Sequence, residues 1–385
     1  MGGIVQYLGV LAFILALLIS VMIHEFGHYI TARKFGMQVT EFFVGFGKRL
    51  WSTQRGETEF GIKAIPAGGY CKISGMTPDD EMAPGDEDRA FYRAKSGKKL
   101  VVLGAGSFLH FVIGTVLLFA LLAGFGVNQA IPKIHSVVKN SPAAAAGVRA
   151  GDEIISINGA EVKNWSKDVA RISDSKGREI TFEIKRGNDV LTIKAAPVRQ
   201  IINNQEKYVF GVITEYGIKR MPVLTSLKDS FIITKEFMVM TVQQLASLPA
   251  KIPALWGQTV GGEKRDPNGL VGVVGAARVS GQTLESNQLT LRERWATFIL
   301  MIASLNIFVG VFNLLPLLPL DGGHMAVAIA DEVRAFYARL RGRPRPAAID
   351  VNRLTPITMV VFVALAALTL LLLAADIFNP VSLNL

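Results

Sequence analysis

The chain of 385 residues is half hydrophobic and only 19% charged, a composition that excludes an ordinary soluble protein. Its length suits two or three domains, so we expect a polytopic α-helical membrane protein with a soluble insertion. The formal net charge of +10 comes from Lys and Arg residues in loops beside apolar runs. This placement indicates membrane topology and argues against nucleic-acid binding, and the single cysteine, Cys71, excludes an internal disulfide.

The first apolar run covers residues 4–23 and is long enough to cross a bilayer. No basic residue precedes it and no small-residue cleavage site follows it, so we expect a retained membrane helix rather than a cleaved signal peptide. Residues 31–99 are polar and rich in Lys and Arg. By the positive-inside rule this segment is cytoplasmic, and the N-terminus lies outside.

The first run ends in the pattern H-E-x-x-H, formed by His24, Glu25 and His28. Residues four apart share a helix face, so both imidazoles can bind one Zn²⁺ ion, and a site with three protein ligands keeps a place for water. Glu25 is the expected general base that accepts a proton from this water. The alternative is a chance match, but polar groups inside an apolar run are costly and usually functional.

A β-hairpin is expected in the cationic segment, with strands at residues 58–66 and 70–73 and a turn at residues 67–69. One interpretation is that its edge pairs with the backbone of an extended substrate. The other interpretation is a plain surface hairpin. The candidate substrate-binding residues on this edge are Gly61, Ile62, Ala64 and Pro66.

The second apolar run, residues 100–127, contains one polar exception, His110. This histidine is either a metal ligand or proton relay, or a histidine packed by a hydrogen bond to a neighbouring helix, and the second interpretation is favoured. After it, strands and polar turns alternate, which predicts an inserted α+β domain on the outer side of the membrane. The expected strands are residues 131–138, 153–158, 180–185 and 190–195, and residues 199–220 complete the sheet.

The last third of the chain returns to apolar sequence. We expect an amphipathic helix on the outer leaflet at residues 221–248, and a Gly-rich re-entrant or surface loop at residues 257–281. The cationic stretch 330–353 is cytoplasmic, and the C-terminus lies outside. The third and fourth membrane spans are residues 295–320 and 357–375. The expected domains are residues 1–127, 128–220, 221–294 and 295–385.

The third span ends in two prolines, Pro316 and Pro319, followed by Asp321. A broken helix at membrane depth is tolerated only inside protein or beside a water-lined cavity, so Asp321 is a functional candidate. The charge rule places the ends of spans one and three on the same, cytoplasmic side. We therefore expect His24, His28 and Asp321 to bind one zinc ion, with His324 as the alternative third ligand.

These motifs together resemble the site-2 protease family, especially the bacterial regulator of sigma-E protease and its relatives with one PDZ domain. The resemblance covers nearly the whole chain. It depends on the H-E-x-x-H motif, the segment from Asn313 to Asp321-Gly322-Gly323, the hairpin at residues 61–70 and a PDZ-like insert at residues 128–220 with Gly151-Asp152 and Asn158-Gly159 turns. The chain departs from the common Ala-Gly-Pro-x-x-Asn pattern of span two, where it has Ala105-Gly106-Ser107-Phe108-Leu109-His110.

The resemblance implies a zinc intramembrane protease of the bacterial inner membrane, with its active site near the cytoplasmic side. Implied substrates are single-pass membrane proteins such as an anti-sigma factor, and remnant signal peptides. It also implies that the hairpin dips into the membrane and that Asn313 holds the substrate or stabilises the oxyanion. The rival function is a non-catalytic membrane scaffold whose PDZ domain captures peptide ends. A metal transporter would need more intramembrane carboxylates or histidines along a path.

Overall fold

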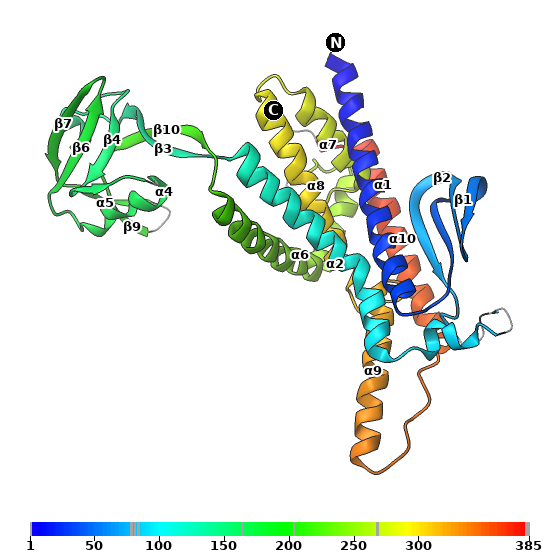
Figure 1. The fold of residues 1–385 in the computed structure, drawn as a ribbon. Coiled ribbons are helices and arrows are strands. Elements are labelled where there is room, and N and C mark those ends of the chain that lie inside the picture. Colours follow the sequence, from blue (N-terminus) through cyan, green and yellow to red (C-terminus); the bar gives the residue numbers. More distant parts are fainter. Residues whose placement is uncertain are drawn as a thin grey trace. The chain divides into compact units, whose positions relative to one another are not determined.

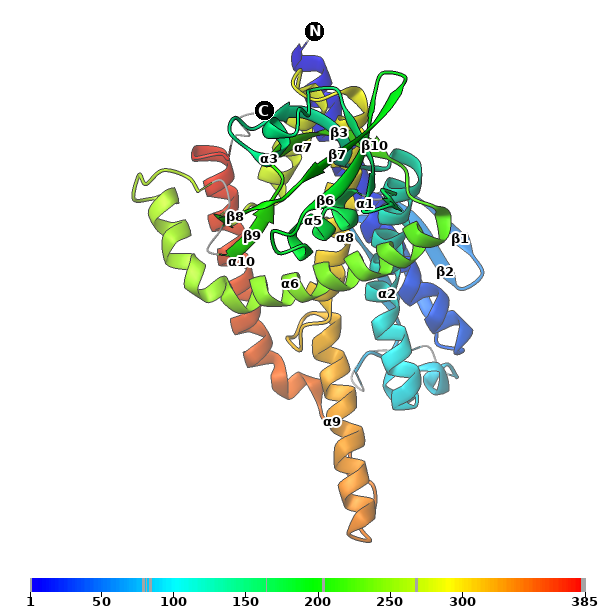
Figure 2. The same ribbon diagram turned by 90° about the vertical axis from the view of Figure 1, so that its left-hand side faces the viewer.

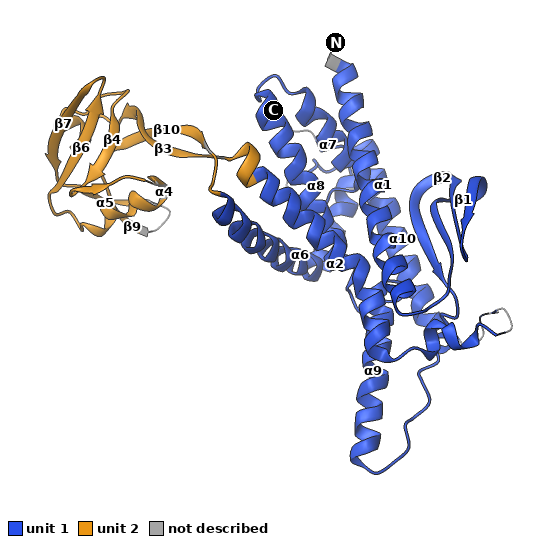
Figure 3. Cartoon of the chain, viewed as in Figure 1, with its two compact units in different colours: residues 1–121, 223–385 blue, residues 122–222 orange. Residues whose placement is uncertain are grey.

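The computed structural model describes residues 2–77, 80, 82, 85–163, 165–202, 205–266 and 269–381. The chain forms two compact units, one of residues 1–121 with 223–385 and one of residues 122–222 (Figure 3). The second unit is an insertion between two parts of the first. The predicted insert of residues 128–220 lies within it.

The first unit is built mainly of helices (Figure 1). Their bounds are α1 (Gly2–Lys34), α2 (Ser96–Ala120), α6 (Val223–Thr259), α7 (Val273–Glu285), α8 (Leu291–Asn313), α9 (Asp321–Leu340) and α10 (Thr355–Phe378). A π-helical turn, η3 (Leu121–Phe125), follows α2, and short 3₁₀ turns are η1 (Glu87–Arg89), η2 (Phe91–Arg93) and η4 (Val351–Leu354).

Among the described residues, four helices are long and apolar enough to cross a membrane. They are Gly3–Lys34, Ser96–Phe125, Leu291–Asn313 and Val351–Phe378. The four predicted apolar helices are thus confirmed as helices of spanning length. The predicted end of the third span at residue 320 is wrong, because α8 stops at Asn313 and the prolines that follow cannot continue its hydrogen-bond ladder.

Strands β1 (Val39–Arg55) and β2 (Thr58–Ile73) form a small sheet beside α1 (Figure 1). Each strand bends back on itself, so residues 41–44 pair with residues 59–62 on one side and with residues 69–72 on the other. Residues 49–55 pair with the outer side of residues 58–63. The predicted hairpin between residues 58–66 and 70–73 is therefore wrong, since the 41–44 strand lies between them.

Helix α6 buries polar side chains and exposes apolar ones. Ser226, Ser230, Thr234 and Thr241 are buried, and Thr234 Oγ1 lies 3.0 Å from Thr115 Oγ1 of α2. Leu224, Phe231 and other large apolar side chains are exposed. Small polar residues against a neighbouring helix and apolar residues outward are typical of a helix that faces lipid. Figure 2 shows α6 running across α8 and α10.

Helix α7 corrects the predicted Gly-rich loop at residues 257–281, most of whose second half is helical. Its glycines are explained by close packing rather than by looping. The carboxylate of Asp376 on α10 accepts a hydrogen bond from the Gly275 backbone N–H at 2.8 Å. Arg265 also lies beside Asp376 at 3.6 Å, and both side chains are buried. A buried carboxylate thus caps the first turn of α7.

The second unit contains a five-strand sheet path in the order β10-β3-β4-β6-β7, with β5 beside β4, and a separate β8-β9 pair. Its core includes Ile134, Ile154, Ile180, Phe182 and Phe210. The strands are β3 (Val127–Val137), β4 (Glu153–Ile157), β5 (Ala160–Glu161), β6 (Ile180–Arg186), β7 (Asp189–Ala195), β8 (Val198–Ile202), β9 (Gln205–Val209) and β10 (Val212–Lys219). The helices are α3 (Pro142–Ala145), α4 (Trp165–Asp168) and α5 (Ala170–Asp174).

The Gly151-Asp152 turn of this unit is held by an ion pair between the buried carboxylate of Asp152 and the partly exposed Arg186. Both carboxylate oxygens of Asp152 accept hydrogen bonds from the Arg186 guanidinium at 2.8 Å, and Asp152 also accepts one from the Arg149 backbone N–H. Hydrogen bonding by Arg186 holds the pKa of the Asp152 carboxyl below its usual value. The carboxylate therefore stabilises the folded unit only while it is ionised.

We expect Asp152→Asn to destabilise the fragment 122–222 at pH 7, as measured by urea unfolding through Trp165 fluorescence. The folded pKa lies below the unfolded one, so the wild-type advantage is present above the unfolded pKa of about 3.9 and disappears as pH falls through the folded pKa. The exposed Glu161→Gln exchange is the control and should change little. A stability gap between wild type and the Asp152→Asn variant that is equally large at pH 7 and pH 3 would contradict this role.

Candidate metal centre

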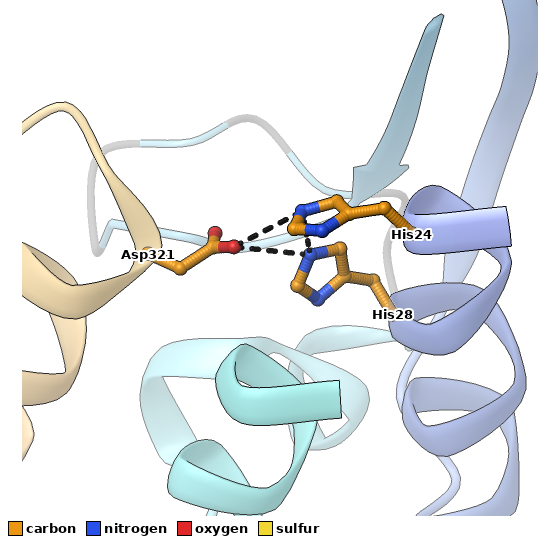
Figure 4. A group of neighbouring side chains, drawn as sticks. All are labelled: His24, His28 and Asp321. Atoms are coloured by element: carbon orange, nitrogen blue, oxygen red, sulfur yellow. Dashed lines mark hydrogen bonds and ion pairs between the residues drawn. The ribbon is translucent and has the colours of Figure 1, made fainter. Parts of the chain in front are cut away.

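Three candidate ligands, His24, His28 and Asp321, converge in the first unit (Figure 4). The Nε2 atoms of the two histidines are 3.0 Å apart. Asp321 Oδ2 lies 3.2 Å from His24 Nε2 and 3.3 Å from His28 Nε2. Both histidines are buried.

These separations fit a zinc ion. Ligand atoms about 2.0–2.1 Å from a tetrahedral zinc ion lie roughly 3.3 Å from one another, close to the three observed distances. Three electron-pair donors that face one another are also unfavourable without a cation between them. The chemistry and spacing of the set therefore suit zinc.

The H-E-x-x-H motif takes its position from α1 and α2. His24 and His28 lie one turn apart on α1, and His28 Nδ1 lies 2.8 Å from the carbonyl oxygen of Val102 on α2. Because a carbonyl only accepts, Nδ1 carries the proton and Nε2 presents its lone pair to the metal position. The predicted pairing of the two histidines on one helix face is confirmed by this geometry.

Asp321 is the first residue of α9, and the preceding turn delivers it to the histidines. The following Gly322 is required by close packing, because an added Cβ would lie 2.3 Å from the Leu314 carbonyl carbon and oxygen. The D-G-G sequence thus lets α9 start directly against the end of α8. His324, the alternative third ligand, is not part of the three-residue cluster found among the described residues.

Glu25 lies beside this cluster, where it interacts electrostatically with both histidines and with Asp321. Cys71, on the outer strand of the small sheet, also lies close enough to Glu25 to interact with its carboxylate. Glu25 is thus close to the metal position without belonging to the ligand cluster. This is the arrangement that a general base requires.

The other predicted site residues are Asn313 and four residues of the small sheet. Asn313 is the half-buried last residue of α8, and its role stays a prediction. The expectation of a free edge at Gly61 and Ile62 is wrong, because each is paired on both sides, with residues 43–44 and with residues 51–52. Ala64 and Pro66 are exposed beyond these pairs. A central strand has no free hydrogen-bonding groups to offer a substrate.

Sequence reasoning missed two polar residues near the cluster, Ser20 and Asn306. Both are buried, and both lie close to His110 Nδ1, at 3.2 Å and 3.0 Å. The hydrogen bond to a neighbouring helix that the favoured interpretation of His110 expects is therefore present. The available signal was the presence of single polar residues within apolar runs.

Comparison with known proteins gives the family. The model of peptidase family M50 matches residues 12–355. The chain belongs to this family, the site-2 proteases. It is 35% identical to the zinc metalloprotease Rip1 of Mycobacterium tuberculosis (strain ATCC 35801 / TMC 107 / Erdman), over 97% of this chain and 98% of that protein.

A second relative is the zinc metalloprotease Rip1 of Mycolicibacterium smegmatis, 35% identical over 98% of both chains. Among solved structures, the PDZ domain of the SdrC-like protein of Listeria innocua matches with 21% identity. It covers 24% of this chain and all of that one, at a TM-score of 0.20. That score is too low to support a shared fold.

We expect His24→Ala, His28→Ala and Asp321→Ala each to abolish stoichiometric zinc binding, because two remaining ligands are too few to hold the ion. Zinc content of the detergent-purified protein, measured by atomic emission, tests this. His324→Ala is the matched control and should keep its zinc. Loss of zinc in that control with retention in Asp321→Ala would reverse the assignment of the third ligand.

Proposed function

We propose that this protein cleaves single-pass membrane proteins within or near their membrane segments. Membership of family M50 makes the chain a zinc metalloprotease. The position of the ligands in and beside helices of spanning length supports cleavage within or near the membrane. His24 and His28 lie in a helix of spanning length, ten and six residues before its basic end at Lys34. Asp321 directly follows the turn after another such helix.

The charge pattern supports an active site near the cytoplasmic side of the bacterial inner membrane. Arg33 and Lys34 end α1, and Arg339 lies in the last turn of α9. By the positive-inside rule these ends are cytoplasmic, and both chain termini and the inserted unit lie outside. Cleavage at this depth needs a site that admits water among apolar helices, and the buried histidines with the ionisable Glu25 provide its polar groups.

Each residue of the cluster has a distinct role. When bound, the zinc ion acts as a Lewis acid that polarises the scissile carbonyl and makes water nucleophilic near neutral pH. Glu25 accepts the proton from the attacking water and later donates a proton to the leaving amine. Val102 fixes the ring of His28 through its carbonyl. Asn313 is the candidate donor to the oxyanion, an interaction worth roughly 3 kcal/mol in comparable sites.

The substrate strand adds to the outer edge of residues 69–73. These residues pair with the 41–44 strand on one side and have no strand partner in the described sheet on the other. They also lie near α1, where Cys71 is close to Glu25. Gly69 also lies against Met22 of α1. An extended peptide on this edge passes beside the general base, whereas Gly61 and Ile62 are already paired twice. We therefore place the substrate-binding edge at residues 69–73 and not at the predicted residues 61–66.

Contact with the bilayer is supported by exposed apolar side chains at one end of the small sheet. Phe46, Leu50, Trp51, Ile62 and Ile65 are all at least 44% exposed. A soluble surface would rarely present such a patch, so this end of the sheet dips into the lipid. The exposed apolar face of α6 has the same explanation.

The inserted unit is a PDZ domain that binds an extended peptide end outside the cytoplasm. A cavity of about 570 Å³ supports this, since it is bordered by α5 residues Ala170 and Ile172 and by Phe210, Gly211 and Val212 at the start of β10. A groove between a helix and a strand is where PDZ domains add a peptide strand. Anti-sigma factors and remnant signal peptides are the proposed substrates, in line with the family resemblance.

We expect Glu25→Gln to retain zinc but to lower the rate of cleavage of a single-pass substrate by about 10²–10⁴-fold, because general-base assistance is removed while the ligands remain. The measurement is cleavage in proteoliposomes together with zinc content. The control is Glu57→Gln, the same exchange at a carboxylate that pairs with Arg33 in the cytoplasmic segment. It should change neither the rate of cleavage nor the zinc content. Full activity of purified Glu25→Gln would end the proposed role of Glu25.

The substrate edge is tested by disulfide cross-linking in a Cys71→Ser background. We expect a cysteine near the cleavage site of the substrate to cross-link to Tyr70→Cys or Lys72→Cys on the edge beside α1. Ser52→Cys, on the opposite edge of the same sheet, is the matched control and should cross-link weakly. Preferential cross-linking at position 52 would place the substrate on the wrong edge for this proposal.

A further inference from the structure

A buried polar cluster lies behind the metal ligands, formed by Ser20 of α1, His110 of α2 and Asn306 of α8. All three side chains are at most 5% exposed. The Ser20 hydroxyl donates a hydrogen bond to Asn306 Oδ1, and His110 Nδ1 lies 3.0 Å from the same oxygen. The cluster thus joins three helices at the depth of His24.

The cluster fixes the tautomer of His110. Asn306 Nδ2 donates to the Ile302 carbonyl at 2.8 Å, so the amide is oriented with Oδ1 toward His110. An amide oxygen only accepts, so His110 Nδ1 carries a proton, and the burial of the ring favours its neutral form. His110 Nε2 is left as a bare acceptor. It is buried and has no hydrogen-bond partner in the described part of the chain.

In His24 the nitrogen without a partner is a donor rather than an acceptor. Its Nε2 faces Asp321 and His28, so the lone pair of Nε2 is directed at the metal position and Nδ1 carries the proton. His24 Nδ1 is also buried and without a partner among the described residues. His28 differs, because its Nδ1 donates to the Val102 carbonyl. One of the two histidine ligands therefore lacks the outer hydrogen bond that such ligands almost always make.

The two unpartnered nitrogens belong to adjacent rings. The ring centroids of His24 and His110 are 5.0 Å apart, at an interplanar angle of 41°. Gly106, one turn before His110 on α2, makes this approach possible, because an added Cβ there would lie 2.5–2.7 Å from atoms of the His24 ring. A ring whose donor lacks an acceptor and a ring whose acceptor lacks a donor are thus neighbours in a buried site.

We propose that His110 is a positioning residue for His24, with His110 Nε2 accepting the Nδ1–H of His24 directly or through one bridging water. The hydrogen-bonded order is then Asn306 Oδ1, His110, His24 and the metal position. Asn306 fixes the tautomer of His110, and His110 fixes the tautomer and ring orientation of His24. The inference rests on the ligand set of the proposed function and adds a residue outside that set.

The test is the zinc affinity of the full-length, detergent-purified protein, measured by competition with a chromophoric chelator. We expect His110→Leu to weaken zinc binding by about 10–100-fold, the usual effect of removing the outer partner of a metal ligand. His110→Gln should restore most of the affinity, because its amide offers both a donor and an acceptor. Thr115→Val is the control, since it removes a different polar tie of α2, the contact with Thr234.

Unchanged affinity in His110→Leu overturns the proposal, as does an equal loss in Thr115→Val, which would indicate general loosening of α2. The proposed ligand set is judged separately, by loss of zinc in His24→Ala. A measurement on the unmodified protein is independent of whether the variants fold. Histidine-selective ¹⁵N NMR of the zinc-loaded chain should show His110 protonated on Nδ1 and His24 on Nδ1, and a proton on His110 Nε2 overturns the proposal.

Discussion

The structure depends on the position of α2, which holds the two ends of the metal site at the same depth. His24 and His28 come from α1 and Asp321 from α9, nearly three hundred residues later, and α2 packs against both helices. The Val102 carbonyl orients His28, and Ser96 at the start of α2 donates to Glu332 of α9 at 2.6 Å. Zinc binding tolerates little displacement of its ligands, so this packing decides whether the site exists.

Helices α1 and α2 can approach closely because glycines occupy positions where the two helices meet. An added Cβ at Gly27 would lie 2.8 Å from the Ala105 carbonyl. At Gly106, the His24 ring occupies the space that a Cβ would need. In lipid, apolar contact provides little net drive for association, so close packing and polar ties must replace it. The glycine of the H-E-F-G-H sequence therefore serves the same site as its histidines.

The sequence was sufficient for the parts of the site that carry local signals. The i, i+4 spacing of His24 and His28 and the prolines before Asp321 are visible in short windows, and polar residues within apolar runs stand out. The pairing order of the small sheet was not predictable in this way. Whether Gly61 is central or at an edge depends on the fold-back of β1 between residues 44 and 49, a long-range arrangement with only weak turn signals. Helix α7 was missed because its glycines are tolerated only through contacts with α10 and α1.

Two groups of polar side chains buried between helices of the first unit differ in whether all their polar atoms have hydrogen-bond partners. In the Thr115–Thr234 pair each hydroxyl lies within hydrogen-bond distance of the other and of a backbone carbonyl, that of Phe111 or Ser230, so neither oxygen is left without a partner. This pair is explained by helix association alone. The Ser20–His110–Asn306 group joins helices as well, but its His110 Nε2 has no hydrogen-bond partner among the described residues, and the His110 ring lies beside the ring of a metal ligand. A purely structural tie has no need of an imidazole there, since an asparagine or serine would bond Asn306 without leaving a buried acceptor unpaired.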